Sequence, residues 1–96
     1  MSIVIVGIPV HNGEKSIKKA IDSVLNQTLQ DFEIIISDNA STDLTKNICE
    51  EYAKNDVRIT YIRQKKNLGY VENFQYLVNS ANSKYFVWLS ADDFLE

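Results

Sequence analysis

Residues 32–43 read FEIIISDNASTD, an apolar run followed directly by a cluster of small polar side chains. The run is rich in β-branched residues and almost continuously apolar, which is typical of a strand covered on both faces. The cluster is rich in residues that form turns and cap helices. This stretch therefore predicts a buried strand over residues 32–37, then a turn, then a helix.

The same order of strand, polar turn and helix is found before that stretch. Residues 2–8, SIVIVGI, predict a first buried strand, which we expect Pro9 to end. Residues 14–26 predict a helix that begins after a cap at Asn12 or Gly13. The apolar residues at helical spacing in this helix are Ile17, Ala20, Ile21, Val24 and Leu25.

The alternation continues to the end of the chain. Ser41 or Thr42 can cap a helix in which Asp43 lies in the first turn, where an acid suits the helix dipole. The apolar side of that helix carries Leu44, Ile48, Cys49 and Tyr52. The remaining elements are predicted to be a strand near a sheet edge (residues 57–62), a third helix (70–81) and a fourth strand (84–89).

This order of elements predicts an α/β fold with a doubly wound, mainly parallel four-stranded sheet, β-α-β-α-β-α-β. Ligands of such sheets bind outside the carboxyl ends of the strands. The segments that leave those ends read PVHN, SDNASTD, RQKKN and SADD, and three of the four are rich in polar groups. We therefore expect a ligand site at this edge of the sheet.

Composition and charge disfavour several classes of protein. The chain has 96 residues, a net charge of −3 and one cysteine, so it makes one small domain without an internal disulfide. General nucleic-acid binding is disfavoured because the only basic cluster is Arg63, Lys65 and Lys66. The apolar start is too short for a membrane span and lacks the basic region of a signal peptide. A cytoplasmic location fits the single Cys49, for which a buried, structural role is expected.

No glycine-rich phosphate-binding motif is present, because GIPVHNG lacks the dinucleotide-binding spacing and no P-loop occurs. A divalent cation held by carboxylates can bridge phosphate to the protein instead, and Asp92 and Asp93 suit Mg²⁺ or Mn²⁺. Simpler interpretations exist for each residue. Asp92 and Asp93 can begin a surface turn or helix. Asp38 and Asn39 can form a turn, and His11 can be an ordinary loop residue.

Taken together, three stretches resemble one known family. Residues 9–45, PVHNGEKSIKKAIDSVLNQTLQDFEIIISDNASTDLT, resemble the opening of the inverting family 2 nucleotide-sugar glycosyltransferases. NLGYVENF resembles the stretch that opens the family's third helix, and YFVWLSADD resembles the strand that ends in its D-x-D-D motif. The residues in register with the family pattern are Pro9, Asn12, Glu14, Ser23, Leu25, Gln27, Thr28, Phe32, Glu33, Asp38, Ser41, Asp43, Asn67, Gly69 and Asn73.

The resemblance implies a GT-A fold, in which a Rossmann-like nucleotide-binding half joins an acceptor half, with the strand order 3-2-1-4. It implies that residues 1–96 are the donor-binding half and that the donor is a nucleotide-diphosphate sugar of UDP or dTDP type. Asp92 would be the metal ligand and Asp93 its neighbour, with Mn²⁺ or Mg²⁺ acting as a Lewis acid on the leaving diphosphate. The implied nucleotide-binding residues are Pro9, Val10, His11, Asn12, Glu14, Asp38, Asn39, Asn67, Ser90 and Ala91.

Three positions depart from the family pattern. Ser90 replaces the first acid of D-x-D, so a ribose or metal contact there is expected to be weaker or water-mediated. His11 replaces the common aromatic before Asn12, so base stacking is expected to differ. Asn39 replaces the second acid of a D-D pair. Its amide can donate as well as accept hydrogen bonds, which leaves the base open between uracil, thymine and another.

The family's general base is a carboxylate on the acceptor half, to which no part of this chain corresponds. We therefore expect a fragment that binds the donor but cannot by itself transfer sugar to an acceptor, which is an unidentified glycan or lipid-linked molecule.

An exposed sheet edge predicts a homodimer, and the inner face of the membrane is a further expected location. A non-catalytic module that binds a nucleotide or a partner protein remains open. A receiver-like signalling domain is disfavoured, because PVHN and RQKKN lack its acids.

Overall fold

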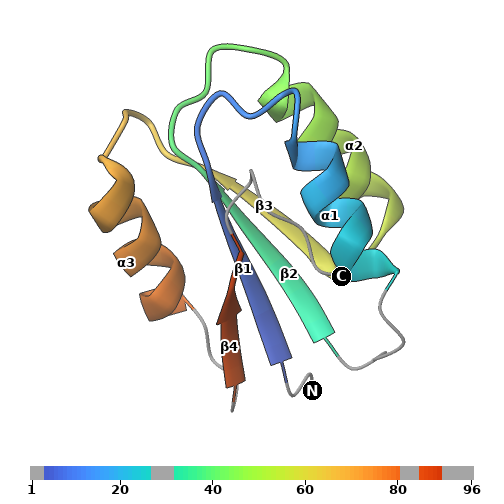
Figure 1. Cartoon of the computed structure of the whole chain (residues 1–96). Coiled ribbons are helices and arrows are strands. Elements are labelled where there is room, and N and C mark those ends of the chain that lie inside the picture. The colour runs from blue at the N-terminus through green and yellow to red at the C-terminus, as the bar shows by residue number, and fades with distance from the viewer. Residues whose placement is uncertain (1–3, 27–31, 81–84, 90–96) are drawn as a thin grey trace.

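The computed structural model describes residues 4–26, 32–80 and 85–89 (Figure 1). The elements in chain order are β1 (Val4–Val10), α1 (Ile17–Leu25), β2 (Phe32–Asp38), α2 (Thr45–Asn55), β3 (Ile59–Arg63), α3 (Tyr70–Ser80) and β4 (Tyr85–Trp88). The strands are parallel and lie in the order β3-β2-β1-β4. The predicted doubly wound parallel sheet and its strand order are confirmed.

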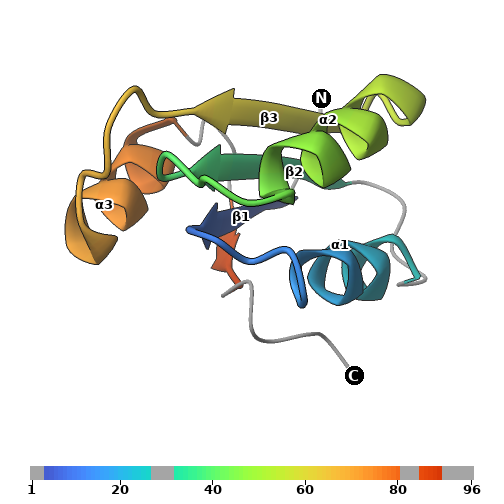
Figure 2. The same cartoon turned by 90° about the horizontal axis from the view of Figure 1, so that it is seen from above.

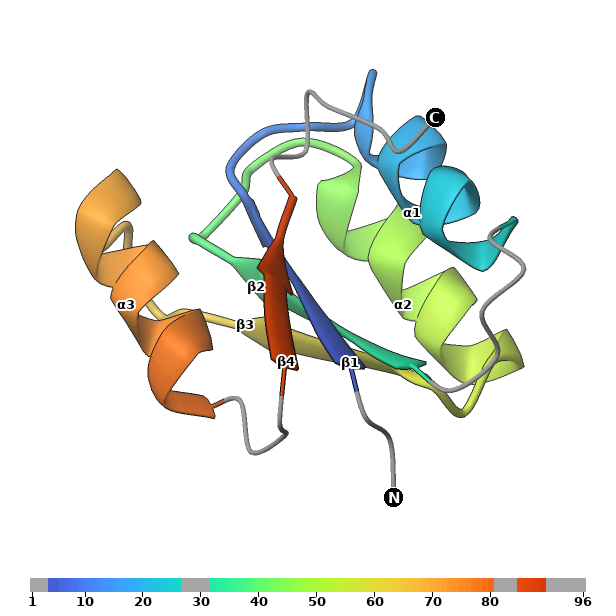
Figure 3. The same ribbon diagram turned by 60° about the horizontal axis from the view of Figure 1, so that its bottom comes forward.

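The sheet is covered differently on its two faces. Helices α1 and α2 pack on one face and α3 on the other (Figures 1 and 3). Register places Val6 beside Ile34 and Ile8 beside Ile36, so these strand residues form rows that face α1 and α2. The buried apolar cluster consists of Val6, Ile8, Val10, Ile17, Ala20, Ile21, Val24, Phe32, Ile34, Ile36, Cys49, Ile59 and Leu89. The main core therefore lies between the sheet and the α1–α2 pair.

Pro9 does not end the first strand, contrary to the sequence prediction. β1 continues to Val10, and its pairing with β2 continues through Pro9 and Val10. Leu89 N–H donates to the Gly7 carbonyl, and Asn39 N–H donates to the Val10 carbonyl. Since backbone groups alternate in direction along a strand, the nitrogen of Pro9 points toward the β4 side, where the β1–β4 pairing of the described residues extends only to Gly7. Within residues 4–26, 32–80 and 85–89, proline is tolerated here because no ladder bond is lost.

The predicted start and cap of the first helix are wrong. α1 begins at Ile17 rather than at Glu14, and its N-cap is Ser16, not Asn12 or Gly13. Residues 14–16 form a turn in which Ser16 N–H and Ile17 N–H both donate to the Gly13 carbonyl. Asn12 cannot serve as the cap because its side chain is bonded to another loop, which is described below.

The predicted cap of the second helix is also wrong. α2 begins at Thr45 with Leu44 as its N-cap, and neither Ser41 nor Thr42 caps it. Asp43 lies before the helix rather than in its first turn, although its Oδ1 accepts the Thr45 N–H at 2.9 Å. The carboxylate therefore satisfies one of the helix's first amides from outside the helix.

The remaining boundaries agree with the predictions to within two residues. β3 begins at Ile59 rather than residue 57, because the Asp56 carboxylate accepts the Arg58 N–H and holds a turn there. Its predicted place at an edge of the sheet is confirmed. No helix within the described residues is long and apolar enough to cross a membrane.

Candidate functional site

The carboxyl ends of β1, β2 and β3 lead into three loops at one edge of the sheet, residues 11–16, 39–44 and 64–69. We call this region the three-loop edge. Figure 2 shows the first two loops turning toward α1 and α2, while the third turns the opposite way toward α3. The fourth expected loop begins at Ser90, outside the described residues. The three-loop edge is where a parallel sheet of this kind binds its ligand.

Loop 11–16 is fastened to loop 39–44 by hydrogen bonds between residues about thirty positions apart. Asn12 is central: its Oδ1 accepts the Thr42 N–H at 2.7 Å, and its N–H donates to Ser41 Oγ at 2.8 Å. Further along, Gly13 N–H donates to Thr45 Oγ1 at 2.9 Å. Asn12 has a left-handed backbone, with a φ of 51°, which asparagine tolerates better than most residues. Its side chain therefore holds two loops together.

Glu14 takes part in the same attachment and lies on the surface. Its N–H donates to Asp43 Oδ2 at 3.2 Å, and its Oε1 accepts the Leu44 N–H at 3.5 Å. The predicted nucleotide-binding residues Asn12 and Glu14 thus have structural partners on the neighbouring loop. Pro9 and Val10, predicted to belong to a loop, are buried residues at the end of β1.

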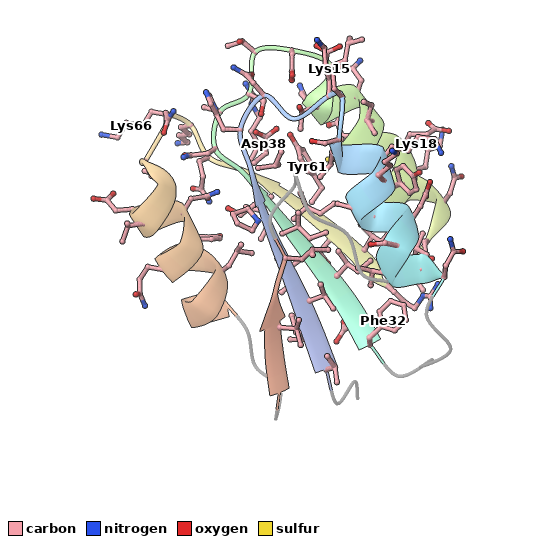
Figure 4. All side chains as sticks on the ribbon, in the orientation of Figure 1. Lys15, Lys18, Phe32, Asp38, Tyr61 and Lys66 are labelled. Atoms are coloured by element: carbon pink, nitrogen blue, oxygen red, sulfur yellow. The ribbon has the colours of Figure 1, made fainter. Side chains whose placement is uncertain are left out.

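Asp38 is fully buried at the end of β2 and has a complete set of partners. Its Oδ1 accepts the Ser41 N–H at 2.9 Å, and its Oδ2 accepts the Tyr61 hydroxyl. Arg63 Nη1 lies 3.5 Å from the same Oδ2. Figure 4 shows Asp38 and Tyr61 side by side beneath the loops. The predicted turn at Asp38 is therefore present, with a buried carboxylate at its base.

Tyr61 responds to this environment. Burial, together with its bond to Asp38, raises the pKa of the Tyr61 phenol well above its usual range. The hydroxyl therefore stays protonated and donates to the carboxylate. Residues Tyr61 and Arg63 were not predicted as part of the site. The only signal in the sequence was that a tyrosine and an arginine come at the end of a strand.

Asn39 is 4% exposed and its side chain is bonded to loop 64–69. Its Nδ2 donates to Asn67 Oδ1 at 2.8 Å and to the Gly69 carbonyl at 3.2 Å. Its Oδ1 accepts the Leu68 N–H at 2.6 Å. Asn67, also a predicted site residue, is exposed. The structure thus brings Asn39 and Asn67 into direct contact.

His11 is exposed and hydrogen-bonded to Asn39. Its Nδ1 donates to the Asn39 carbonyl at 2.7 Å. Asn12 Nδ2 lies 3.4 Å from the other ring nitrogen, Nε2. The imidazole is therefore oriented by its neighbours, with its ring accessible to a ligand.

A second polar cluster, missed by the sequence analysis, fastens α3 to the end of β2. Ser37 Oγ donates to Asn73 Oδ1 at 2.6 Å, and Asn73 Nδ2 donates to the Ser37 carbonyl at 3.0 Å. Gln64 Nε2 donates to Ser37 Oγ at 3.1 Å. A serine at the end of an apolar strand is the signal that could have indicated this contact.

The structure also tests the prediction for Cys49. Cys49 is fully buried, and burial with nearby carboxylates raises the pKa of its thiol to about 12. The thiol is therefore protonated at neutral pH and its predicted structural role is confirmed.

The predicted residues Ser90, Ala91, Asp92 and Asp93 lie outside the described residues. Within residues 4–26, 32–80 and 85–89, no three acidic, histidine or cysteine side chains gather in a way that could hold a metal ion.

Comparison with known proteins places this chain in a family. Residues 5–96 match Glycosyl transferase family 2. An uncharacterized glycosyltransferase of Haemophilus influenzae is 38% identical over 91 residues, which are 95% of this chain and 28% of that protein. Chondroitin synthase of Escherichia coli is 39% identical over 95 residues, which are 98% of this chain and 14% of that protein. The chain thus spans less than a third of the length of each relative.

Solved structures agree. S. aureus TarS 1–349 in complex with UDP-GlcNAc has a TM-score of 0.88 at 26% identity, over 98% of this chain and 27% of that chain. The mannosyltransferase PcManGT from Pyrobaculum calidifontis, in complex with GDP-Man and Mn²⁺, shares the fold with a TM-score of 0.87 at 22% identity, over 96% of this chain and 28% of that chain. Since the family match covers nearly the whole chain, the chain belongs to glycosyl transferase family 2.

Proposed function

We propose that this chain is the donor-binding part of a glycosyltransferase that moves a sugar from a nucleotide-diphosphate sugar to an acceptor hydroxyl with inversion. The observation that carries the proposal is the three-loop edge. In a member of this family, three loops meet at the carboxyl ends of parallel strands and are fixed to one another by side-chain hydrogen bonds. Such an arrangement is organised before a ligand arrives, which lowers the entropic cost of binding.

The donor is proposed to be of UDP or dTDP type. TarS, at 26% identity over 98% of this chain, has been solved with UDP and with UDP-GlcNAc, which supports a nucleotide-sugar donor here. The oriented, exposed ring of His11 suits contact with the base. Asn67 is also exposed, whereas the buried side chains of Asp38 and Asn39 contribute by holding the loops in place.

Electrostatics at the edge are compatible with a diphosphate. The Asp38 carboxylate is fully buried, is bonded to Tyr61 and lies near the Arg63 guanidinium. It therefore presents little negative charge to a ligand. Arg63, Lys65 and Lys66 lie at the end of β3 and in the loop that follows, and Lys65 and Lys66 are exposed. Positive charge near the donor favours binding of a diphosphate.

A divalent ion, Mn²⁺ or Mg²⁺, is proposed to be held by Asp92 and Asp93. The described edge does not provide such a site by itself, because the oxygens of Asp38 are already bonded to protein donors. The proposal therefore depends on the adjacent carboxylates of Asp92 and Asp93 in the sequence. When bound, the ion would neutralise charge on the leaving nucleoside diphosphate. The residues Ser90 and Ala91 are proposed to contact the nucleotide.

We propose that these 96 residues bind the donor without transferring sugar, and that the acceptor is a glycan or lipid-linked molecule reached in the cytoplasm or at the inner face of the membrane. A homodimer through a sheet edge is part of the proposal. In the described residues the two edges are β3 and β4, and Val87 of β4 is 39% exposed.

The proposal is tested by mapping the NMR chemical shifts of backbone amides during titration with UDP-GlcNAc and Mg²⁺, which is diamagnetic. The expected shifts gather in residues 11–16, 39–44 and 64–69. Amides at the opposite end of the sheet, such as Phe32 and Ile59, serve as the internal control and should not move. Saturable shifts confined to another surface, or no shifts at millimolar ligand, would contradict a donor site at this edge.

A further inference from the structure

The side chain of Asn39 makes three hydrogen bonds at the three-loop edge, all of them to loop 64–69. Both of its amide protons are donated, one to Asn67 Oδ1 and one to the Gly69 carbonyl. Its oxygen accepts the Leu68 N–H. Three consecutive residues of loop 64–69 are therefore held by one side chain that comes from β2's carboxyl end.

These partners fix which end of the amide points where. The Leu68 N–H can only donate, so it must face the oxygen of Asn39, and the Gly69 carbonyl can only accept, so it must face the nitrogen. Asn67 is fixed in the same way, because its Oδ1 also accepts the Gly69 N–H at 2.7 Å. The ambiguity of an amide that can turn over is removed by backbone groups on both sides.

We infer that Asn39 is a positioning residue, whose amide nitrogen holds the turn at residues 67–69 against the end of β2. A carboxylate at this position cannot do this, because it would face the oxygens of Asn67 and Gly69 without a proton to share. The departure from the acidic family pattern at Asn39 is thus matched by a loop that requires a donor.

The loop has other attachments, which explain why Asn39 acts on its middle. Gln64 N–H donates to the Asp38 carbonyl at 2.8 Å, and Asn73 N–H donates to the Gly69 carbonyl at 3.1 Å. Gly69 has a φ of 85°, a conformation that suits glycine. With both ends of the loop fixed, the contacts of Asn39 determine the path of residues 67–69 between them.

A consequence for the ligand rests on the proposed function. While the loop is in place, both amide protons of Asn39 are committed, and only the second lone pair of its oxygen is open to a further bond. Asn39 can therefore accept a hydrogen bond from a ligand but cannot donate one.

The inference is tested with Asn39→Asp, which is nearly isosteric, removes the donor and adds a negative charge. Asn47→Asp, on the exposed first turn of α2, is the matched control for the added charge. Hydrogen exchange of the Gly69 amide reports on the turn and needs no ligand, and calorimetric titration with UDP and Mn²⁺ reports on binding. Asn39→Asp is expected to speed exchange at Gly69 about tenfold and to weaken UDP binding about tenfold, whereas Asn47→Asp changes neither.

A second variant covers the case in which a new carboxylate beside Asp38 prevents folding. Asn67→Ala removes an exposed partner of Asn39 and is read at the Leu68 amide, which donates to Asn39 Oδ1 and keeps its own acceptor in this variant. Exchange at Leu68 is expected to become faster in the folded variant. Unchanged exchange at Gly69 in folded Asn39→Asp, or at Leu68 in folded Asn67→Ala, would overturn the inference. If the wild-type chain does not bind UDP, the proposed function fails while the exchange experiment still decides the role of Asn39.

Discussion

Different interactions stabilise two regions of the molecule: the sheet face covered by α1 and α2, and the three-loop edge. On that face, fully buried Ile8, Ile21 and Ile36 pack in an apolar cluster. At the edge, cohesion comes from directional hydrogen bonds, such as those that the Thr42 N–H donates to Asn12 Oδ1 and the Leu68 N–H donates to Asn39 Oδ1. Within the described residues, no buried side-chain polar atom is left without a partner. The face supplies stability, and the edge has a defined shape at the proposed ligand site.

This difference predicts whether a substitution should lower stability or ligand affinity. Apolar packing depends on volume and tolerates a similar side chain, because its attraction is not directional. A hydrogen-bonded loop depends on a donor or an acceptor at one point, so an isosteric change can remove the function. Changes to the core should therefore lower stability, and changes to the edge should lower ligand affinity more than stability.

The largest effect is expected from Ile36→Ala, which empties a fully buried position in the centre of the core. Lost burial and the resulting cavity should lower the free energy of unfolding by about 2–5 kcal/mol, measured by urea denaturation. Ile36→Val is the matched control and should cost about 1 kcal/mol. Equal, small losses in both variants would show that the core is not the main source of stability.

Tyr61→Phe is expected to have the next largest effect. Loss of the bond to the buried Asp38 carboxylate should lower stability at neutral pH by about 1.5–3 kcal/mol. The pKa of Tyr61 is raised in the folded state, so its stabilising contribution is complete below the unfolded value of 10.0 and is lost as pH rises above it. Denaturation between pH 8 and pH 11 should therefore show the wild type losing more stability than the variant. Parallel curves would contradict this role for Tyr61.

Asn12→Gly tests the attachment between the first two loops. Glycine keeps the left-handed backbone at φ 51° but removes the acceptor for the Thr42 N–H. Stability should fall by about 1 kcal/mol, while Asn12→Asp, which retains an acceptor oxygen, should remain near the wild type. UDP affinity should fall in the first variant and be retained in the second. An equal loss of affinity in both would point to a direct contact between the amide nitrogen and the ligand.

Ala40→Gly is expected to have the smallest effect, and a stabilising one. Ala40 has a φ of 59°, where its Cβ is strained and glycine is not. Relief of this strain should exceed the extra flexibility that glycine gives the unfolded chain, for a net gain of about 0.5–1 kcal/mol. Thermal denaturation measures the gain, and Ala53→Gly, in the interior of α2, should give a loss instead.

The sequence predicted the parts of the molecule that depend on local pattern. Apolar runs at residues 32–37 and the helical spacing from Ile17 to Val24 carry their own periodicity, so the elements and the doubly wound sheet could be derived from them. The predicted helix caps were wrong for a physical reason. Ser41 and Thr42 have side chains that suit a cap, but the Asn12 N–H donates to Ser41 Oγ and Asn12 Oδ1 accepts from the N–H and the hydroxyl of Thr42.

The site was predicted by residue type more than by role. The polar residues Asn12, Asp38 and Asn39 do gather at the predicted edge, because parallel strands end there. Their partners could not be derived, since Asn39 selects Leu68 and Asn67 through the path of a loop that no local pattern specifies. Tyr61 was expected only to belong to a strand, and its bond to Asp38 follows from the pairing of β2 with β3.

We propose that the three-loop edge binds a nucleoside diphosphate. Calorimetric titration of the chain with UDP, dTDP and GDP, each with and without Mn²⁺, and again with Asp92→Ala, measures this binding. Binding of UDP or dTDP is predicted to require the metal ion and to be lost in Asp92→Ala. Failure of all three nucleotides to bind in the presence of Mn²⁺, by a chain shown to be folded, would contradict it.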